Sequence, residues 1–536
     1  MQPYYFKIAL VFVCAIFILT SCAPAAGDWS SSASSLPAET SSRPQEGIPS
    51  RPIIQKDGRF QIPYDSSDSL HPYRSSSALN NALHTLVYDS LVKLDNDFTP
   101  VMSIASDIQI DGAVCTVTLK NGVRFSDGSP LTAIDVRYSI DCIRSSGSLY
   151  ASRLSNVVSY AVQDDRTLVI TLQSPDNLFV NLLDFPVIQS GTNQRDYPVG
   201  SGRYRYAEDE PPQNESSDEE SADVADIRLV ANPEWHGGTI QTFRELYLTA
   251  YDYSQSLIYT LKSGAIDFAF TDLAQAQSST NMGSSPIQVP LTNLVYVGVN
   301  NTSGVTSAAS FRKALSLCFD RSQIVSEAFL SRATPSSTPF NPNMYATKEL
   351  DNQLYADVEG ANSILDALGY TARDEQGYRM YGNNRLTLSV LVNTDNFYRT
   401  QAARVIKENL SQVGIDCVIT ERNPGDYLSA VRASDFSLYI GETKLYTNND
   451  LSPFFTGDGA LSYGGTANGS VASSYFSLRR GEIDFNYFSN AFFEQSPFIP
   501  LVFRNGVSFF TQTMSYNVKS SMSDPFFNIE DWTYAR

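Results

Sequence analysis

The sequence predicts a mixed α/β fold, and alternating strand and helix patterns carry this prediction. An apolar run over residues 386–392 is followed by a helix with one apolar face that ends at Gly414, and residues 415–420 then alternate between apolar and polar side chains. A strand, a helix and a strand joined by short loops form a βαβ unit, which implies parallel pairing. The apolar strand at 294–299, followed by a single helix expected over 311–330, gives a second strand and helix in succession.

The N-terminal half adds shorter elements of both kinds. Apolar residues between 83 and 91 share one helical face, which predicts a helix there. Residues 115–125 alternate on both sides of an Asn-Gly turn, which predicts a hairpin. Thr132 followed by Asp135 has the pattern of a capping box that opens a helix, and residues 168–172 predict a further strand.

The length and composition describe a large folded protein. The chain has 536 residues, of which 42% are hydrophobic, so global disorder is excluded and about three domains, or one large multi-lobed one, are expected. The formal net charge is −19. This acidic balance argues against sequence-independent nucleic-acid binding and against attraction to an anionic lipid surface, since both need clustered Lys and Arg.

The N-terminus predicts an exported and anchored protein. Lys7 precedes an unbroken apolar run over residues 8–19. As a helix this run would be about 18 Å long, short of the ~30 Å hydrocarbon core, so it predicts a signal peptide over residues 1–21 and not a membrane span. The run ends in Leu19-Thr20-Ser21-Cys22, which resembles the bacterial lipobox. The resemblance implies cleavage before Cys22 and lipidation of its sulfur; the alternative is an ordinary secretory signal with an incidental cysteine.

Two segments are expected to lie outside the packed core. Residues 22–52 are rich in Ser and Pro and almost free of large apolar side chains, which predicts a flexible tether before a globular body of residues 53–536. Residues 207–226 hold nine acidic residues and no basic one, which predicts a solvated surface loop; a cation-binding role is the alternative.

The remaining cysteines are expected to be buried free thiols. They stand among apolar residues at strand or helix spacing, although disulfides or metal ligation stay open as alternatives. The four positions are Cys115, Cys142, Cys318 and Cys417.

No catalytic motif stands out. The chain has three histidines, and it contains no nucleophile elbow, HExxH, Walker loop or EF-hand pattern. We therefore expect no enzyme activity, no catalytic residues, no cofactor and no resident metal, although a pair of carboxylates in a cleft could still be present among 57 acids.

A family resemblance extends over most of the globular body. The stretch from Leu83 to Asp135 resembles the signature region of bacterial extracellular solute-binding proteins, family 5, the peptide- and nickel-binding subunits of ABC importers. The residues in register with that pattern are Tyr88, Pro100, Ala105, Gly112, Leu119, Gly122, Phe125, Asp127, Gly128, Ala133 and Asp135. Later blocks keep the order of the family, with Ser201 and Arg203 departing from it; they lie at residues 198–204, 232–235, 261–267, 311–325, 410–415 and 496–501.

The resemblance implies an α/β, two-lobed periplasmic-binding-protein-like fold (class II) with an extra subdomain on lobe I. Two chain crossings, near residues 288 and 488, would form the hinge between the lobes. The implied division is lobe I at 53–75, 197–288 and 489–536, the extra subdomain at 76–196, and lobe II at 289–488.

The resemblance also places a ligand segment in lobe II. Peptide-binding members carry there a motif that pairs with the peptide backbone and offers an acid to its ammonium group. The corresponding positions here are Tyr439, Gly441 and Glu442, where Tyr and Glu replace the Trp and Asp of the family. Tyr446, Asn448, Asn449 and Asp450 are weaker candidates, and a surface loop position for Glu442 is the alternative.

The expected function follows from the family. The protein is expected to be a monomeric lipoprotein on the outer face of the cytoplasmic membrane, which captures a small peptide or similar solute and delivers it to the permease subunits of an ABC importer. Binding of nickel or a metal chelate by the same fold is the nearest alternative. A cell-wall peptide hydrolase and a sensor lipoprotein that presents a peptide are alternatives from other classes.

Overall fold

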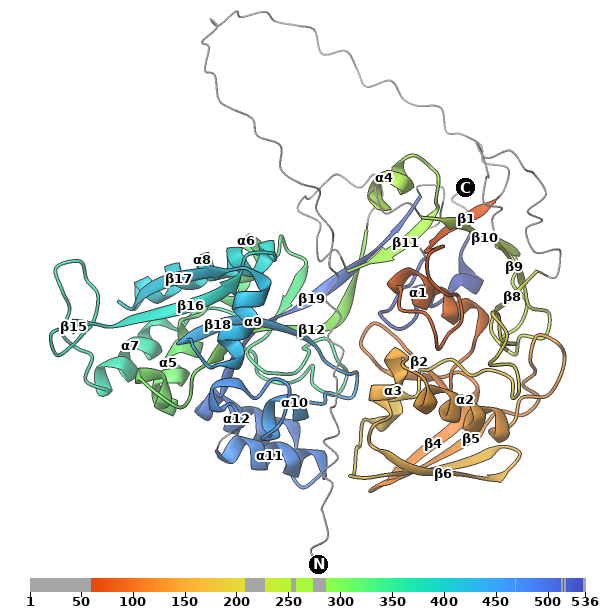
Figure 1. Ribbon diagram of the computed structural model, residues 1–536, viewed down its shortest axis with the longest axis horizontal. Helices are drawn as coiled ribbons and strands as arrows, with labels where there is room; N and C mark the ends of the chain where they lie inside the picture. The colour runs from red at the N-terminus through yellow and green to blue at the C-terminus, as the bar shows by residue number, and fades with distance from the viewer. Residues whose placement is uncertain are drawn as a thin grey trace, which may run out of the picture. The chain divides into compact units, whose positions relative to one another are not determined.

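Figure 1 shows the computed structural model, which describes residues 59–207, 227–251, 257–272, 286–467, 469–511, 514 and 517–533. These residues belong to one compact unit, Gln55–Arg536. The predicted signal peptide at 1–21, Cys22, the tether at 22–52 and nearly all of the acidic stretch at 207–226 lie outside the described residues.

A seven-stranded sheet is the largest in the described chain. Its strands run in the order β11-β19-β12-β18-β16-β17, with β13 paired to β19. The two longest strands, β12 and β19, are antiparallel neighbours. The bounds are β11 Phe268–Thr271, β12 Ile287–Val299, β13 Ala333–Pro335, β16 Thr387–Asn393, β17 Asp416–Arg422, β18 Leu438–Lys444 and β19 Phe498–Phe510.

Two four-stranded sheets and two short pairs hold the other strands. Their orders are β1-β10-β9-β8, β4-β5-β7-β6, β2-β3 and β14-β15. The bounds are β1 Phe60–Tyr64, β2 Val92–Leu94, β3 Pro100–Met102, β4 Ala105–Asp111, β5 Val114–Leu119, β6 Val157–Asp164, β7 Thr167–Leu172, β8 Tyr204–Tyr206, β9 Ile227–Ala231, β10 Glu245–Ala250, β14 Met380–Tyr381 and β15 Asn384–Arg385.

Helices are distributed along the whole described chain, so the predicted mixed α/β class is confirmed. Among the described residues, none of the helices combines the length and the apolar character that crossing a membrane requires. The bounds are α1 Ala78–Val87, α2 Ala133–Ser145, α3 Leu149–Arg153, α4 Leu257–Lys262, α5 Ala309–Cys318, α6 Arg321–Glu327, α7 Val358–Ala367, α8 Phe397–Gln412, α9 Pro424–Arg432, α10 Ser452–Phe455, α11 Ser470–Arg479 and α12 Phe485–Gln495.

The predicted βαβ unit is confirmed. Strands β16 and β17 pair in parallel from Thr387↔Asp416 to Asn393↔Arg422, and α8 connects them and runs alongside them (Figure 1). The helix ends where Gly414 adopts a φ of 80°, a backbone conformation that glycine takes without steric cost.

Two local predictions are wrong in detail. The single helix expected over 311–330 is two helices, α5 and α6, because the Asp320 carboxylate accepts a 2.7 Å hydrogen bond from the Gln323 amide and starts a new helix. The hairpin expected over 115–125 does not form. Strand β5 pairs instead with β4, which directly precedes it, and with the distant β7, so both of its edges are already covered.

Other local predictions are confirmed. Thr132 and Asp135 form the capping box at the start of α2, and the strand predicted at 168–172 is β7. The four cysteines within the described residues are buried and free, and they are Cys115, Cys142, Cys318 and Cys417.

The seven-stranded sheet is covered on both faces. Alternate residues of β12 face opposite sides, because successive side chains in a strand point to opposite faces. Val295 and Val297 join a core with α5 and α8, whereas Leu294 and Tyr296 join an aromatic-rich core with α10, α11 and α12.

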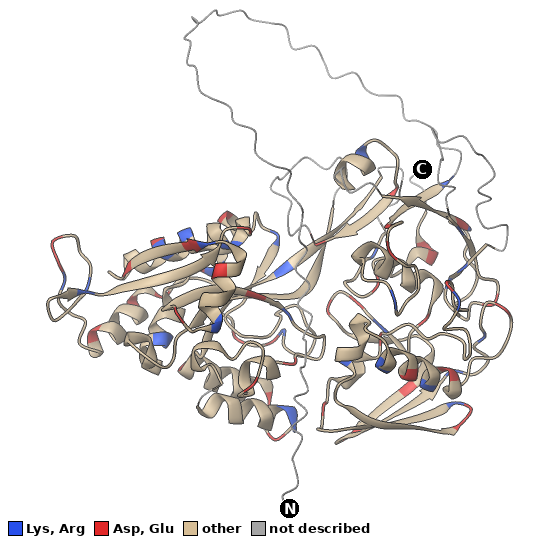
Figure 2. Cartoon of the chain, in the orientation of Figure 1, with Lys and Arg blue, Asp and Glu red and all other residues tan. Residues whose placement is uncertain are grey.

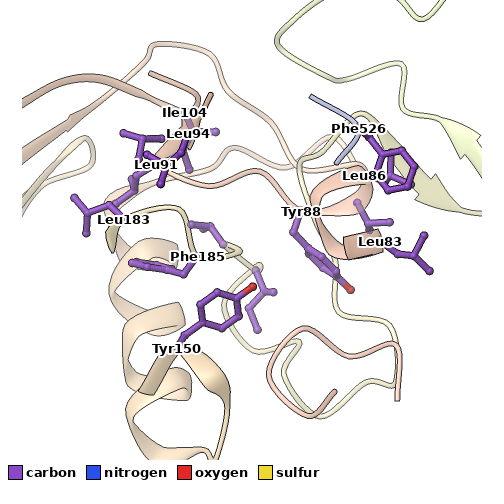
Figure 3. Close-up of a cluster of buried hydrophobic side chains, with 14 of the residues drawn as sticks. Leu83, Leu86, Tyr88, Leu91, Leu94, Ile104, Tyr150, Leu183, Phe185 and Phe526 are labelled. Atoms are coloured by element: carbon purple, nitrogen blue, oxygen red, sulfur yellow. The ribbon is translucent and has the colours of Figure 1, made fainter. Parts of the chain in front are cut away.

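A separate core joins the two four-stranded sheets with α1 and the C-terminal residues. Figure 3 shows Phe526 next to Leu86 of α1, although the two are far apart in sequence. Arg203 departs from the family pattern, and its side chain is fully buried. Its guanidinium pairs with Asp524 at 2.7 Å and with Glu530 at 3.2 Å. A buried cation needs such partners, so the departure at 203 depends on acids near the C-terminus.

Candidate functional site

The strand that holds Tyr439, Gly441 and Glu442 is paired unevenly on its two sides. Strand β18 pairs with β12 along its full length, from Val299↔Leu438 to Asn293↔Lys444. On its other side it pairs with β16 only at Leu438 and Tyr439. The part of β18 after Tyr439 is therefore an edge on the β16 side.

The alternation of hydrogen-bonded residues along β18 shows which main-chain groups point to that edge. The Asn300 amide donates to the Ser437 carbonyl at 3.0 Å, and the Leu445 amide donates to the Thr292 carbonyl at 3.0 Å. Since bonded and non-bonded pairs alternate in an antiparallel ladder, Gly441 and Thr443 also bond to β12. The N–H and C=O groups of Glu442 and Lys444 point the other way, where the hydrogen bonds of the described chain give them no partner. We call Glu442–Lys444 the open edge.

Tyr439 and Gly441 shape the sheet beneath the open edge. Tyr439 is buried, and its hydroxyl lies 3.3 Å from that of Tyr296 on β12. Burial raises the pKa of the Tyr439 phenol well above its ordinary value. Each tyrosine ring covers a glycine of the facing strand, and a Cβ at Gly441 would lie 2.6 Å from Cζ of Tyr296. This position therefore requires glycine.

Glu442 is an ionised acid with a resident partner. Its side chain is 14% exposed, and its Oε1 lies 2.7 Å from Nη1 of Arg504 on β19. The amide of Asn293 donates a further hydrogen bond at 3.1 Å. Burial would raise the pKa of Glu442, but the charges of Arg504 and Arg399 and these hydrogen bonds hold it below its ordinary value. Glu442 lies in a strand and is mostly covered, so it is not the surface loop acid of the alternative.

Residues 445–450, which we call the crossing segment, connect β18 to distant parts of the chain. Tyr446 is partly buried against the core around α1. The hydroxyl of Thr447 donates to the Asn181 carbonyl at 2.7 Å. Asn449 is buried with a φ of 55°, and Asp450 accepts a hydrogen bond from the Tyr475 hydroxyl at 2.7 Å. These contacts hold the segment in one conformation.

A cavity of about 410 Å³ lies beside the crossing segment. At its wall, Asp176 is held by Nη2 of Arg479 at 2.5 Å and by the Asn448 amide at 2.7 Å. The Asn448 Oδ1 atom is buried and has no hydrogen-bond partner among the described residues. The lining is formed by residues 176–178, 448–449, 478–479 and 481–485.

The structure brings together only some of the predicted residues. Asn448 and Asn449 line the cavity, whereas Glu442 belongs to the open edge. Asp450 accepts a hydrogen bond from the Ser452 amide at 2.9 Å, at the start of α10. Sequence reasoning missed Asp176, Arg479 and Arg504, because single charged residues far apart in sequence form no motif. Within the described ranges, no group of three or more His, Cys, Asp or Glu side chains is arranged to hold a metal ion. Figure 2 shows Lys and Arg interspersed with Asp and Glu along the described chain.

Comparisons with known proteins agree with this architecture. Residues 99–460 match the family described as bacterial extracellular solute-binding proteins, family 5. A protein of Brucella ovis, provisionally named an ABC transporter peptide-binding protein, is 24% identical over 353 residues, which cover 62% of this chain and 61% of that protein. The oligopeptide-binding protein AppA of Bacillus subtilis is 23% identical over 364 residues, which cover 64% of this chain and 65% of AppA. The chain therefore spans less than two thirds of the length of these relatives.

A solved structure shows the same fold. The nickel ABC transporter protein of Bacillus halodurans superimposes with a TM-score of 0.70 at 17% identity, covering 87% of this chain and 98% of that one. The likeness confirms the predicted two-lobed periplasmic-binding-protein-like α/β fold. The lobe and subdomain boundaries given above stay predictions.

Proposed function

Because the chain belongs to the bacterial extracellular solute-binding proteins of family 5, we propose that it is the substrate-binding component of an ABC importer. In this proposal it captures a peptide-like solute between its lobes and delivers it to the permease subunits. Closure of two lobes over a solute removes it from water and gives the permease a distinct shape to recognise.

The open edge of β18 is the observation that favours a peptide as the ligand. An extended peptide can add to an exposed strand edge through its main chain, and this mode needs donors and acceptors at alternate residues. Glu442 and Lys444 present their main-chain groups in that spacing. A compact solute such as a metal ion would leave this regular array unused, so the geometry favours an extended ligand.

The predicted ligand residues take distinct roles in this proposal. Glu442 supplies main-chain and side-chain groups to the ligand, and Gly441 and Tyr439 set the position of the strand. Tyr446, Asn449 and Asp450 hold the crossing segment that borders the site. The cavity beside Asn449 has room for a side chain of the ligand, at about 410 Å³.

The placement of the protein in the cell is a further part of the proposal. Lipidation of Cys22 would hold a monomer on the outer face of the cytoplasmic membrane, with residues 22–52 as the tether. In the native organism, Cys22→Ala should release the protein into the surrounding fluid or leave it unprocessed. A variant that is still processed and membrane-bound would show that Cys22 is not the anchor.

An N-methyl scan of a bound peptide tests the function. A peptide recovered from the purified protein by mass spectrometry would be resynthesised with single main-chain N-methyl groups, and its affinity measured by calorimetry. Methylation should weaken binding about tenfold or more at alternate residues beside β18, since each lost hydrogen bond leaves a buried group unpaired. Binding of nickel or a chelate with no peptide bound would contradict the proposal.

A further inference from the structure

Arg504 is fixed beside Glu442 by contacts from two elements. Besides the pair with Glu442, its Nη2 donates to the Asp272 carbonyl at 2.9 Å, and its Nη1 lies 3.8 Å from the Asp272 carboxylate. Its side chain is only 6% exposed. It comes from β19, where its backbone pairs with Ala333 of β13 and lies where the register between β19 and β12 shifts.

The negative charge of the Glu442 carboxylate is thus already neutralised by a residue of the protein itself. A guanidinium at contact distance neutralises the acid through a charge-assisted hydrogen bond, and the Asn293 amide occupies a further lone pair of the same oxygen. A ligand ammonium would have to compete with Arg504 for this carboxylate. An uncharged ligand group leaves the pair intact and strands no charge.

From this geometry we infer that Arg504 determines specificity: it adapts the site to peptides with an uncharged group beside Glu442, such as N-acylated peptides. The inference rests on the proposed function and names the ligand class for the same site. A peptide with a free amino terminus gains little from Glu442 while Arg504 is present. Without Arg504, the same acid would select for a cation.

The test compares a free peptide with its N-acetylated form by calorimetry at pH 7. The wild-type protein should bind the two within about threefold, as expected for a charge that is already paired. Arg504→Met should prefer the free peptide by about tenfold or more, because Glu442 then loses its hydrogen-bonded cation and keeps only the more distant charge of Arg399. The double variant Arg504→Met/Glu442→Gln should lose that preference again.

A second variant keeps the test decisive if Arg504→Met fails to fold. Glu442→Gln leaves Arg504 with only the more exposed Asp272 carboxylate 3.8 Å away, so this variant should prefer the acetylated peptide by about tenfold, since the guanidinium repels an ammonium. A tenfold or greater preference of the wild type for the free peptide would overturn the inference while the proposed function stands. Failure of the wild type to bind either form would overturn the proposed function itself.

Discussion

The contact between Asp176 and Arg479 should be a strong determinant of stability. The Asp176 side chain is 1% exposed, and the Arg479 side chain that pairs with it is 17% exposed. Arg479→Met removes the guanidinium and leaves the carboxylate buried. Loss of one partner of a buried pair costs about 3–5 kcal/mol. The Asn448 amide at 2.7 Å and the Leu178 amide at 3.0 Å remain bonded to Asp176, which places the expected loss near the lower value.

The neighbouring arginine provides a matched control. Arg480 pairs with Glu482 at 2.6 Å, but their side chains are 47% and 52% exposed. Exposed pairs contribute little to stability, so Arg480→Met should be nearly neutral. Urea denaturation followed by circular dichroism would give the free energy of unfolding of both variants. A loss of about 3 kcal/mol corresponds to more than a hundredfold in the unfolding equilibrium constant.

A double variant tests whether the unpaired Asp176 carboxylate causes the loss of stability. Asp176→Asn/Arg479→Met removes both charges, so it should recover part of the stability lost in Arg479→Met. Equal free energies of unfolding for Arg479→Met and Arg480→Met would refute the reasoning. So would a double variant less stable than Arg479→Met alone.

Three further outcomes are expected. Burial lowers the pKa of His84 to about 3, so the folded state resists its protonation. Its contribution to stability should be full above pH 6.5 and be lost as the pH falls toward 3, by up to about 5 kcal/mol, and the pH dependence of unfolding should flatten in His84→Leu. Gly441→Ala places a Cβ 2.6 Å from Tyr296 and should lower the free energy of unfolding by about 1–3 kcal/mol. In Gly425→Ala the nearest atom to the new Cβ is 3.5 Å away, so this control variant should be close to neutral in the same assay. Burial raises the pKa of the Cys115 and Cys318 thiols to about 12, so a thiol reagent should label them in the folded protein far more slowly than in urea, as peptide mass spectrometry would show; equal labelling rates would contradict their burial.

The parts of the fold that could be predicted are those fixed by local pattern. The βαβ unit around α8 has an apolar strand, an amphipathic helix and a glycine stop within one short stretch, so its parallel pairing follows from neighbouring residues. The capping box at Thr132 is local as well. The division between α5 and α6 was also readable in principle, since Asp320 is a good N-cap, but the apolar pattern continued across it.

The parts that could not be predicted depend on contacts between distant residues. Nothing near Asp176 indicates that Arg479 will pair with it, and nothing near Glu442 indicates Arg504. The predicted hairpin after β5 failed because β4, which directly precedes β5, takes one of its edges and the distant β7 takes the other. For the site, the family resemblance located the segment from Tyr439 to Asp450, but the open edge and the paired state of Glu442 became visible only with the sheet register.

Amide hydrogen exchange at β18 is the most direct test of peptide addition to the open edge. The amides of Gly441 and Thr443 are bonded to β12 and should be protected with or without ligand. The amides of Glu442 and Lys444 should exchange faster in the ligand-free protein and slow by about tenfold or more when a peptide is bound, since each gains a main-chain partner. Exchange at Glu442 and Lys444 that stays unchanged under saturating peptide would contradict the account.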